Sequence, residues 1–455
     1  MISEERIAEL ERRLQEAVRE NAALREENAR LRKELEEWKR GHRERAKRRS
    51  SRAEGCRQGR GKRPGRKGGH AGAFRAVPKP DRTVVHPLPS RCGCGGHVKP
   101  NGETESTIVQ DLPVPRVENV QHVAPVGLCD RCHRRVVAKL PGAVRAGQSV
   151  AQVQLGPNAQ ALILQLRYEG RMSLGCMVSV LNTWFGLQIT KGGITQLVDR
   201  VRNRTEGSYF EVVEHVRAAG VVGLDETGLR QDGATGWVWL ARTHEASLFR
   251  IELSRGSWVA EAMLGEGFVG VVCSDFYGVY TARQDWRHGY CWGHTLREAK
   301  KIAEVDPTPA TVGFRDELSD WYAGALGTQR RGRLTEREAA KDQLADILVD
   351  GPSWQHPDIE RLCDRLAEHF EGATAFVDDR KIPATNNQTE QDIRPIALMR
   401  KVTGGTRSVK GSRSLAHWMT ITQTLRKNGL SLREYVIEAY QAHLRGRAPP
   451  SVFAH

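Results

Sequence analysis

The chain has 455 residues, of which 39% are hydrophobic and 6% aromatic, and this length indicates roughly two to four domains. It contains no apolar run of about 18 residues and begins with charged residues, so we expect neither a transmembrane helix nor a secretory signal. The nine cysteines are too few and scattered for a disulfide scaffold, which favours a reducing cytosol.

Residues 1–40 carry a heptad repeat with Glu and Arg at the flanking positions, which predicts a leucine-zipper coiled coil. Two Asn residues at a positions would fix the register of a parallel homodimer. The alternative is a long amphipathic helix packed on its own domain. The a positions are Ile7, Leu14, Asn21, Asn28 and Leu35, and the d positions are Leu10, Ala17, Leu24, Leu31 and Trp38.

A basic, Gly-rich arm follows at residues 41–86. Residues 39–80 hold sixteen Lys or Arg against two acids, so this segment carries +14 of the net charge of +15 and the rest of the chain is nearly neutral. Such a polycation suits the phosphate backbone of DNA, where each neutralised phosphate releases counterions. The alternative is a solvated linker. The predicted DNA contacts of the arm are Arg45, Lys47, Arg48, Arg49, Lys62, Arg63, Arg66 and Lys67.

The cysteine pattern of residues 87–140 predicts a small zinc-binding β-unit, with two or three short strands between a C-x-C pair and a C-x-x-C pair. Two turns that offer four thiolates suit one tetrahedral, structural Zn²⁺. His97 and His133 are substitute ligands if the first cysteine does not reach, and four free thiols are the alternative. The expected ligands are Cys92, Cys94, Cys129 and Cys132.

Residues 150–215 read as a helical domain. Helices are predicted over 157–168, 173–184 and 191–204, the last with Thr190 as its N-cap. The short turn between the last two helices resembles a DNA-reading helix-turn-helix, with Lys191, Gln196 and Arg200 as candidate contacts. A plain helical spacer explains the pattern equally well.

Three carboxylates follow in the C-terminal half. Asp225 and Asp275 each end an apolar, strand-like run, and Glu390 lies in the first turns of a helix that starts near Thr385. Taken alone, each Asp is a common strand-end cap. If they converge at the edge of a mixed sheet, the three hard oxygen donors suit two Mg²⁺ or Mn²⁺ ions and an in-line phosphoryl displacement.

The order of these segments resembles the DDE transposases of the insertion sequence 66 family. The resemblance covers roughly residues 1–445 and is most specific in GRKGGHAG (65–72), LDETGL, SDFYGVY with CWGHTLREAKK, and PATNNQTEQDIRPIALMRK. It implies an RNase H-like catalytic domain over 216–445, with a helical insertion at about 296–376 and a tail at 446–455. The fold class is then a multidomain α+β/α/β protein: coiled coil, zinc-binding β-unit, helical linker and a mixed sheet flanked by helices.

The resemblance also implies site residues. It assigns Asp225, Asp275 and Glu390 as catalytic metal ligands, with no departure from the family's triplet, whereas the C-x-C pair departs from the family's C-x-x-C. A supporting signature matches Cys291, His294, Asn386, Asn387 and Arg394. Cations near Glu390 that would hold DNA phosphates are Arg400, Lys401 and Arg407.

These features predict a transposase that binds the inverted repeats of its mobile element and performs metal-dependent strand cleavage and transfer. The expected partners are DNA, a second copy of the chain and accessory proteins encoded beside it, with no membrane, and the expected location is the bacterial cytoplasm at the nucleoid. The alternatives are a zinc-containing DNA-binding regulator without catalysis and a nuclease of the same fold.

Overall fold

The computed structural model describes residues 77–112, 115–138, 154–350 and 354–454. The expected coiled coil and nearly all of the basic arm lie outside these ranges. The chain divides into two compact units, residues 1–111 and residues 112–455. In the described part of the chain, no helix combines the length and apolar character that crossing a membrane requires.

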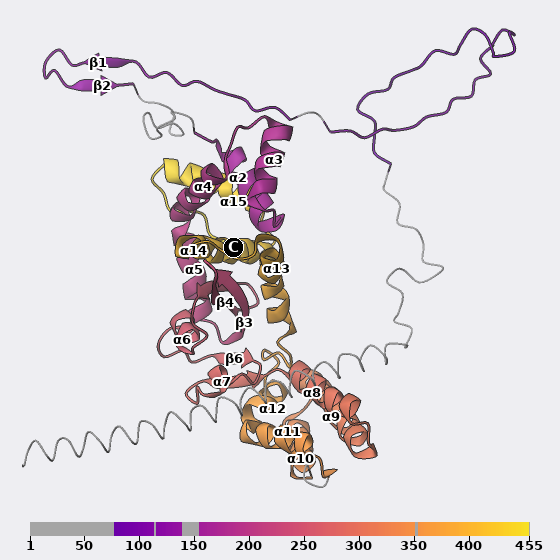
Figure 1. Cartoon of the computed structure of the whole chain (residues 1–455), viewed down its shortest axis with the longest axis vertical. Coiled ribbons are helices and arrows are strands. Elements are labelled where there is room, and N and C mark those ends of the chain that lie inside the picture. The colour runs from indigo at the N-terminus through magenta and orange to yellow at the C-terminus, as the bar shows by residue number, and fades with distance from the viewer. Residues whose placement is uncertain (1–76, 113–114, 139–153, 351–353, 455) are drawn as a thin grey trace, which may run out of the picture. The chain divides into compact units, whose positions relative to one another are not determined.

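The second unit contains a five-stranded mixed sheet in the order β5-β4-β3-β6-β7, of which β3, β4 and β6 are labelled in Figure 1. The pairs β3–β4 and β4–β5 are antiparallel, whereas β3–β6 and β6–β7 are parallel. This arrangement confirms the expected mixed sheet and is compatible with an RNase H-like core. The strands are β3 (Val221–Gln231), β4 (Ala234–Arg242), β5 (Ser247–Glu252), β6 (Val271–Ser274) and β7 (Arg287–Tyr290).

The turn of the β3–β4 hairpin has a conformation that suits the connection of two antiparallel strands. Asp232 and Gly233 both have positive φ, at 51° and 79°, the conformation that an Asp-Gly turn adopts readily. The two strands then pair without interruption from Gly223–Arg242 to Gln231–Ala234. Asp225 lies on this hairpin.

Helices precede the sheet as the sequence predicts. The side chain of Ser173 caps α3 by accepting the Cys176 N–H, and Thr190 caps α4 by accepting the Gly193 N–H. A π-helical turn, η1, extends α2. The elements are α2 (Pro157–Leu164), η1 (Gln165–Glu169), α3 (Leu174–Phe185), α4 (Lys191–Arg204) and α5 (Glu206–Arg217).

A second group of helices lies between β7 and α13 and includes the expected insertion at 296–376. It has its own apolar cluster, in which Trp292, Phe314 and Phe376 are buried and Trp292 Nε1 donates to the Ala373 carbonyl at 2.7 Å. The helices are α8 (Trp292–Val305), α9 (Pro309–Arg331), α10 (Leu334–Val349), α11 (Pro357–Glu368) and α12 (Phe370–Asp378).

The C-terminal helices close the core around the sheet. Helix α14 packs on β5, and its Trp418 is fully buried and stacks on Tyr168 at 5.8 Å. The expected tail at 446–455 also packs: Val452 is fully buried, and its N–H donates to Glu211. The remaining helices are α6 (Trp258–Leu264), α7 (Gly278–Thr281), α13 (Asn387–Thr403), α14 (Val409–Lys427) and α15 (Leu432–Leu444).

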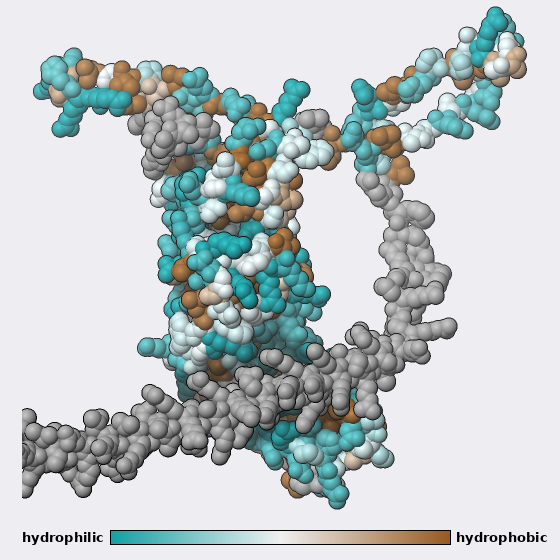
Figure 2. All heavy atoms as spheres, viewed as in Figure 1, coloured by the Kyte–Doolittle hydropathy of each residue, from teal (hydrophilic) through white to brown (hydrophobic). Residues whose placement is uncertain are grey.

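The segment expected to form the zinc-binding unit is mostly extended. Among its described residues, strands occur only as the hairpin β1 (Val126–Leu128) and β2 (Arg135–Val137). Strand β1 lies between the two cysteine pairs and β2 follows the second pair, and the zinc-binding β-unit stays a prediction. Figure 2 shows brown, apolar residues on the surface of these segments. The exposed apolar residues of 87–140 include Leu88, Val109, Val123 and Leu128.

Candidate active site

Asp225 and Asp275 lie at equivalent positions just past the end of the parallel pairing between β3 and β6. The β3–β6 pairing runs from Val221–Val271 to Gly223–Cys273. Asp225 lies two residues beyond Gly223, and Asp275 lies two residues beyond Cys273. Both carboxylates therefore follow the same end of the parallel ladder, which is where ligands bind in open α/β sheets.

The position of Asp225 corrects one expectation. Asp225 does not end its strand but is the fifth of the eleven residues of β3. Beyond Gly223 the strand loses its parallel partner β6 and continues in antiparallel pairing with β4, where Asp225 faces Leu240. The apolar run ends at Asp225 because the buried parallel ladder ends there, not because the strand does.

The helix that carries Glu390 packs closely on β3. Asn386, the N-cap of α13, is buried and donates its side-chain N–H to the Leu224 carbonyl at 2.8 Å. Gly223 makes this approach possible, because a Cβ there would overlap Thr389 Oγ1 and lie 3.0 Å from Asn386 Oδ1. Asn386 is thus a structural residue of the Asn-Asn-x-x-Glu motif, whereas Asn387 is exposed.

The Cys-x-x-His signature meets the same helix start from the opposite side. The buried Cys291 accepts the Asn386 N–H on its sulfur at 3.0 Å, and burial raises the pKa of its thiol. Three residues on, His294 Nε2 lies 3.6 Å from Glu390 Oε1. The signature therefore anchors α13 through Cys291 and contacts the third carboxylate through His294.

Glu390 also pairs with a cation that the sequence did not single out. Arg297, one turn beyond His294 in α8, donates from Nη2 to Glu390 Oε1 at 3.0 Å. Both side chains are partly exposed, so this pair contributes little to stability. It compensates the charge of Glu390 on the side that faces α8.

The three carboxylates interact electrostatically. Burial and, after it, the negative charges of Glu226, Asp275 and Glu390 together raise the pKa of Asp225 to about 7, against a hydrogen bond from the Glu226 N–H. Asp275 Oδ1 accepts the Tyr277 N–H at 3.1 Å. In the described residues, no three His, Cys, Asp or Glu side chains lie close enough to hold a metal ion in the present geometry.

The donor set nevertheless fits a hard divalent cation. It consists of carboxylate oxygens from β3, from the residue after β6 and from a helix start, and burial beside other carboxylates raises the pKa of Asp225. The carboxylate of Glu390 is turned toward Arg297 and His294. A rotation of that side chain toward Asp225 is what a metal complex would require.

A second acidic residue lies beside Asp225 and was not foreseen as part of the site. The Glu226 side chain is 5% exposed. It accepts a hydrogen bond from Arg255 Nη2 at 2.6 Å and another from the Tyr280 hydroxyl. Glu226 stands next to Asp225 in the quoted LDETGL motif, so its place was visible there. Arg255 lies in a loop between β5 and α6, and no local pattern marks it.

The cations after Glu390 divide into two kinds. Arg400 is half-buried and donates to the Thr227 hydroxyl and the Gly228 carbonyl of β3, so it braces the strand that carries Asp225. Arg394, Lys401 and Arg407 are exposed. On α4, Lys191, Gln196 and Arg200 are likewise exposed.

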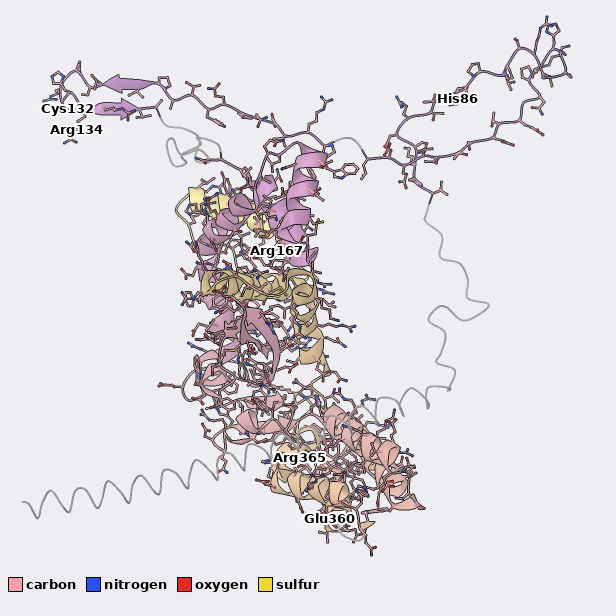
Figure 3. All side chains as sticks on the ribbon, in the orientation of Figure 1. His86, Cys132, Arg134, Arg167, Glu360 and Arg365 are labelled. Carbon is pink, nitrogen blue, oxygen red and sulfur yellow. The ribbon has the colours of Figure 1, made fainter. Side chains whose placement is uncertain are left out.

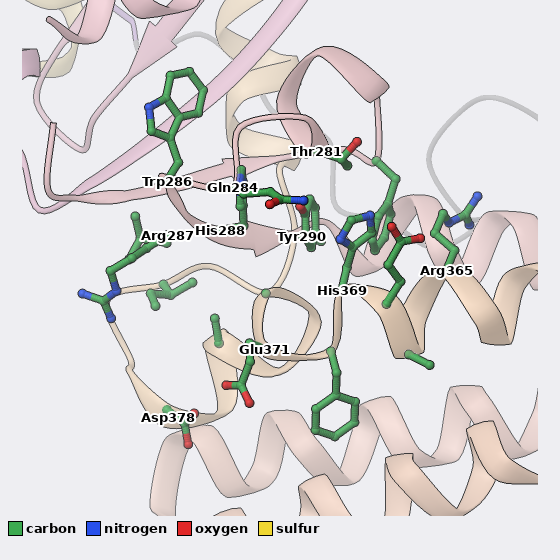
Figure 4. Close-up of a pocket in the computed structure, with 18 of the residues that line it drawn as sticks. Thr281, Gln284, Trp286, Arg287, His288, Tyr290, Arg365, His369, Glu371 and Asp378 are labelled. Carbon is green, nitrogen blue, oxygen red and sulfur yellow. The ribbon is translucent and has the colours of Figure 1, made fainter. Parts of the chain in front are cut away.

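A cavity of about 980 Å³ opens beside the residues that follow Asp275 (Figure 4). Rings line one wall: Phe276 stacks on Tyr290 at 4.3 Å, and Tyr290 stacks on His288 at 5.2 Å. The guanidinium of Arg365, labelled in Figures 3 and 4, lies 4.9 Å from the centre of the Phe276 ring. The opposite wall carries acidic residues of α11 and α12, among them Glu371.

The cysteine pairs lie in two turns, one in each compact unit. In the first unit, the Cys92 N–H donates to the Gly96 carbonyl, and the backbone N–H of Cys94 lowers the pKa of Cys92. In the second, the turn of the β1–β2 hairpin carries Cys129 and Cys132, the latter labelled in Figure 3, and the Cys132 N–H lowers the pKa of Cys129. Each turn thus favours a thiolate at its first cysteine.

The sequence of residues 152–414, more than half of the chain, matches the family described as Transposase IS66 family. The chain belongs to the Transposase IS66 family. The matched range spans α2 to α13 and the start of α14, the whole five-stranded sheet, and all three carboxylates. Membership supports a transposase role in general, and it confirms the family that the sequence resembles.

Two relatives come from Sinorhizobium fredii. The "Uncharacterized protein y4jO" is 24% identical over 191 residues, which cover 41% of this chain and 57% of the relative. The "Uncharacterized protein y4hP" is 22% identical over 407 residues, which cover 79% of this chain and 71% of the relative. The chain thus spans little more than half of the first relative and most of the second.

Proposed function

We propose that this protein is a DNA transposase that binds the terminal inverted repeats of its mobile element, cleaves a strand at each end and joins the freed 3′-hydroxyl to target DNA. The observation that carries the proposal is that Asp225 of β3 and Asp275, directly after β6, follow the same end of the parallel ladder, with Glu390 on α13, which packs on β3. The sheet order and strand directions support an RNase H-like catalytic domain.

Asp225, Asp275 and Glu390 would hold two Mg²⁺ or Mn²⁺ ions, which supply Lewis-acid stabilisation to the attacking and leaving oxygens of phosphoryl transfer. The chain itself sets the geometry. The β3–β6 ladder aligns the two Asp, and the contacts of Asn386 with Leu224 and Cys291 fix the start of α13. Glu390 lies one turn into that helix.

The test is cleavage of a labelled element end in the presence of Mg²⁺ or Mn²⁺. We expect wild-type protein to nick the end and join it to target DNA, and Asp225→Asn or Glu390→Gln to lose both reactions while still binding the end. Glu252→Gln, which changes an acid on the outer strand β5, is the matched control. Strand transfer by the Asp225→Asn protein at the wild-type rate would contradict the proposal.

Two other functions are outcomes of the same experiment. Tight binding of the ends without metal-dependent cleavage would favour a DNA-binding regulator. Cut ends without joined molecules would favour a nuclease. The separation of the carboxylates from the exposed cations of α4 allows binding and cleavage to be scored independently.

We further propose one structural Zn²⁺ bound by Cys92, Cys94, Cys129 and Cys132. The lowered pKa of the first thiol in each turn supports this, and so do the exposed apolar residues of both segments, which need a staple to order them. We expect about one Zn²⁺ per chain by elemental analysis, and a loss of bound zinc in Cys129→Ser. Full zinc content in that variant would argue against the quartet.

DNA, a second copy of the chain and accessory proteins of the same element remain proposed partners. The homodimer rests on the heptads of residues 1–40, which lie outside the described ranges. Its test is sedimentation of the full chain against a chain with Leu24 and Leu31 replaced by Ser, which should shift a dimer to a monomer. An unchanged sedimentation coefficient would remove the zipper from the proposal.

A further inference from the structure

The proposed function requires side chains that distinguish a terminal repeat from other DNA. The cations of the basic arm do not supply that distinction, because contacts with phosphates carry no sequence information directly. Base sequence is read by side chains that reach the edges of the bases, for which the major groove admits an α-helix. The helices that precede the sheet contain such a candidate in α4.

Helices α3 and α4 contact each other and are joined by a short turn, residues 186–190. Gly186 ends α3 in the left-handed conformation, at φ 66° and ψ 15°, which favours glycine. The Asn182 side chain bridges the turn, since its Oδ1 accepts the Ile189 N–H at 3.1 Å and its Nδ2 donates to the Ile189 carbonyl at 3.5 Å. Thr190 then caps α4. A glycine in a short turn between two helices is typical of a helix-turn-helix.

The first two turns of α4 present a polar face that is exposed among the described residues. The one acid of α4, Asp199, does not belong to that face, because it is 7% exposed, accepts the Ser414 hydroxyl and pairs with Lys410 Nζ at 2.8 Å. The start of α14 thus contacts the middle of α4 and leaves its first two turns open. The remaining face is basic and rich in hydrogen-bonding groups, which suits DNA. The exposed residues of α4 are Lys191, Gly192, Thr195, Gln196, Arg200 and Asn203.

The starts of α3 and α4 lie on the same side of the motif. The Lys191 side chain lies beside the first turn of α3, because a Cβ on Gly175 would be 3.6 Å from Lys191 Cε and 3.9 Å from its Nζ. In a helix-turn-helix bound to DNA, the first helix crosses the backbone, and the first residues of the second helix contact the bases. Lys191 therefore occupies a position suited to a phosphate, and Gln196, in the second turn of α4, a position suited to a base.

We propose that α4 lies in the major groove of the element end, where Gln196 reads the edge of a base and Lys191 contacts a neighbouring phosphate. The inference rests on the proposed transposase function and names a residue that distinguishes an element end from other DNA. The amide of Gln donates and accepts hydrogen bonds together, which matches the N6 amino group and N7 of adenine. The target of Gln196 is therefore an A·T base pair, whereas the arm adds affinity for any sequence.

The experiment measures binding of full-length wild type and Gln196→Ala to a labelled element end and to a scrambled duplex of the same composition. We expect Gln196→Ala to bind the end about 5- to 100-fold more weakly, the value of a bidentate base contact, and the scrambled duplex equally well. Lys191→Gln should weaken binding to both duplexes by a similar factor, because a phosphate contact is blind to sequence. Gln343→Ala, which changes an exposed residue of α10, is the matched control.

Single base-pair substitutions across the end locate the contact. At one A·T pair, a substitution should weaken wild-type binding by about the same factor as Gln196→Ala does, and it should weaken the binding of that variant no further. A role of Gln196 in folding alone would lower affinity by the same factor at every substituted position. Thermal melting of each variant checks folding.

Each outcome decides the inference. Unchanged affinity of Gln196→Ala for the element end would overturn it, as would an equal loss on both duplexes or the same loss in Gln343→Ala. These results leave a wild type that still binds and cleaves the end, so the proposed function stands. A wild-type protein that neither prefers nor cleaves the element end would overturn the proposed function and this inference with it.

Discussion

Asp225 is largely buried and lies near other negative charges, and both disfavour its ionised form in the folded protein. Burial is the largest cause, and together with the charges of Glu226, Asp275 and Glu390 it raises the pKa of Asp225 from an ordinary value of 3.8 to about 7. The neutral form is therefore favoured in the folded protein. Its stabilising effect is complete below pH 3.8 and is lost as the pH rises through 7, so at pH 8 the ionised carboxylate destabilises the fold.

Asp225→Asn should therefore raise stability at pH 8 while it abolishes cleavage. Because Asn cannot ionise, we expect a gain on the order of 1–3 kcal/mol in the free energy of unfolding at pH 8, and little difference near pH 4. Mn²⁺ should stabilise wild type at pH 8 more than the variant. Denaturant titration at both pH values, with chelator and with Mn²⁺, measures this, and an equal gain at both pH values would contradict it.

His417 gives stability the opposite pH dependence. Burial and, to a smaller extent, the charge of Arg202 together lower its pKa to about 3, and its Nε2 lies 2.8 Å from the Thr205 hydroxyl, which itself donates to backbone carbonyls. The folded state thus holds the neutral ring, whereas the unfolded chain takes up a proton below about pH 6.5. Stability from His417 is complete above pH 6.5 and falls as the pH drops toward 3.

We expect wild-type protein to lose about 2 kcal/mol between pH 7 and pH 5 through His417 alone. His417→Gln should reduce that slope, although it lowers stability at pH 7. The exposed His244 is the control, because His244→Gln removes a histidine without touching the core. Unfolding curves across pH 5–8 provide the measurement; identical slopes in wild type and His417→Gln would show that the ring does not titrate as described.

The contact between β3 and α13 is the element-level feature on which the site depends. Gly223 lets the helix start approach the strand, Asn386 bonds to the Leu224 carbonyl, and Cys291 holds the Asn386 N–H from the α8 side. Glu390 lies on α13, far along the chain from the two Asp, so the packing of α13 on β3 sets its position relative to them. A small displacement of α13 therefore changes its distance from Asp225 directly.

Gly223→Ala should impair catalysis more than folding. Its Cβ would overlap Thr389 Oγ1, so α13 must move by a fraction of an ångström, at a cost of about 1–3 kcal/mol. We expect cleavage to fall by about 100-fold, because misplacement on this scale disrupts reacting geometry. Gly228→Ala on the same strand is the control, since its nearest neighbour is Arg400 Nη1 at 3.9 Å. Equal activity in the two variants would separate the site from this contact.

The elements that depend on local chemistry could be predicted from the sequence. Helix α4 has the expected bounds and N-cap because Thr190 acts within its own turn. The position of Asp225 in the middle of β3 could not be predicted. The end of the apolar run marks where β6 stops pairing with β3, and β3 itself continues. Arg255 was invisible because its partners, Trp237, Glu226 and Tyr277, come from three separate segments.

At the scale of the whole molecule, the excess positive charge and the three carboxylates lie in different parts of the chain. Residues 39–80 carry +14 of the net +15, while the remainder, including the sheet and its three carboxylates, is nearly neutral. We expect most of the salt-dependent affinity for DNA to come from the arm, and the part of the chain that holds the sheet to add a few fixed contacts.

Replacing Lys62, Arg63 and Arg66 by Gln should flatten the dependence of DNA affinity on salt. Each lost phosphate contact lowers the slope of log K against log salt by about 0.9, so three lower it by up to about 2.7. The control replaces three exposed cations at the α9–α10 turn, Arg330, Arg331 and Arg333, by Gln, which makes the same change in net charge. Binding to a labelled element end from about 50 to 200 mM salt measures both. Equal shifts of the slope in the two triple variants would show that net charge alone sets the affinity. A shift confined to the arm variant would assign the phosphate contacts to the arm, because only local contacts release condensed counterions.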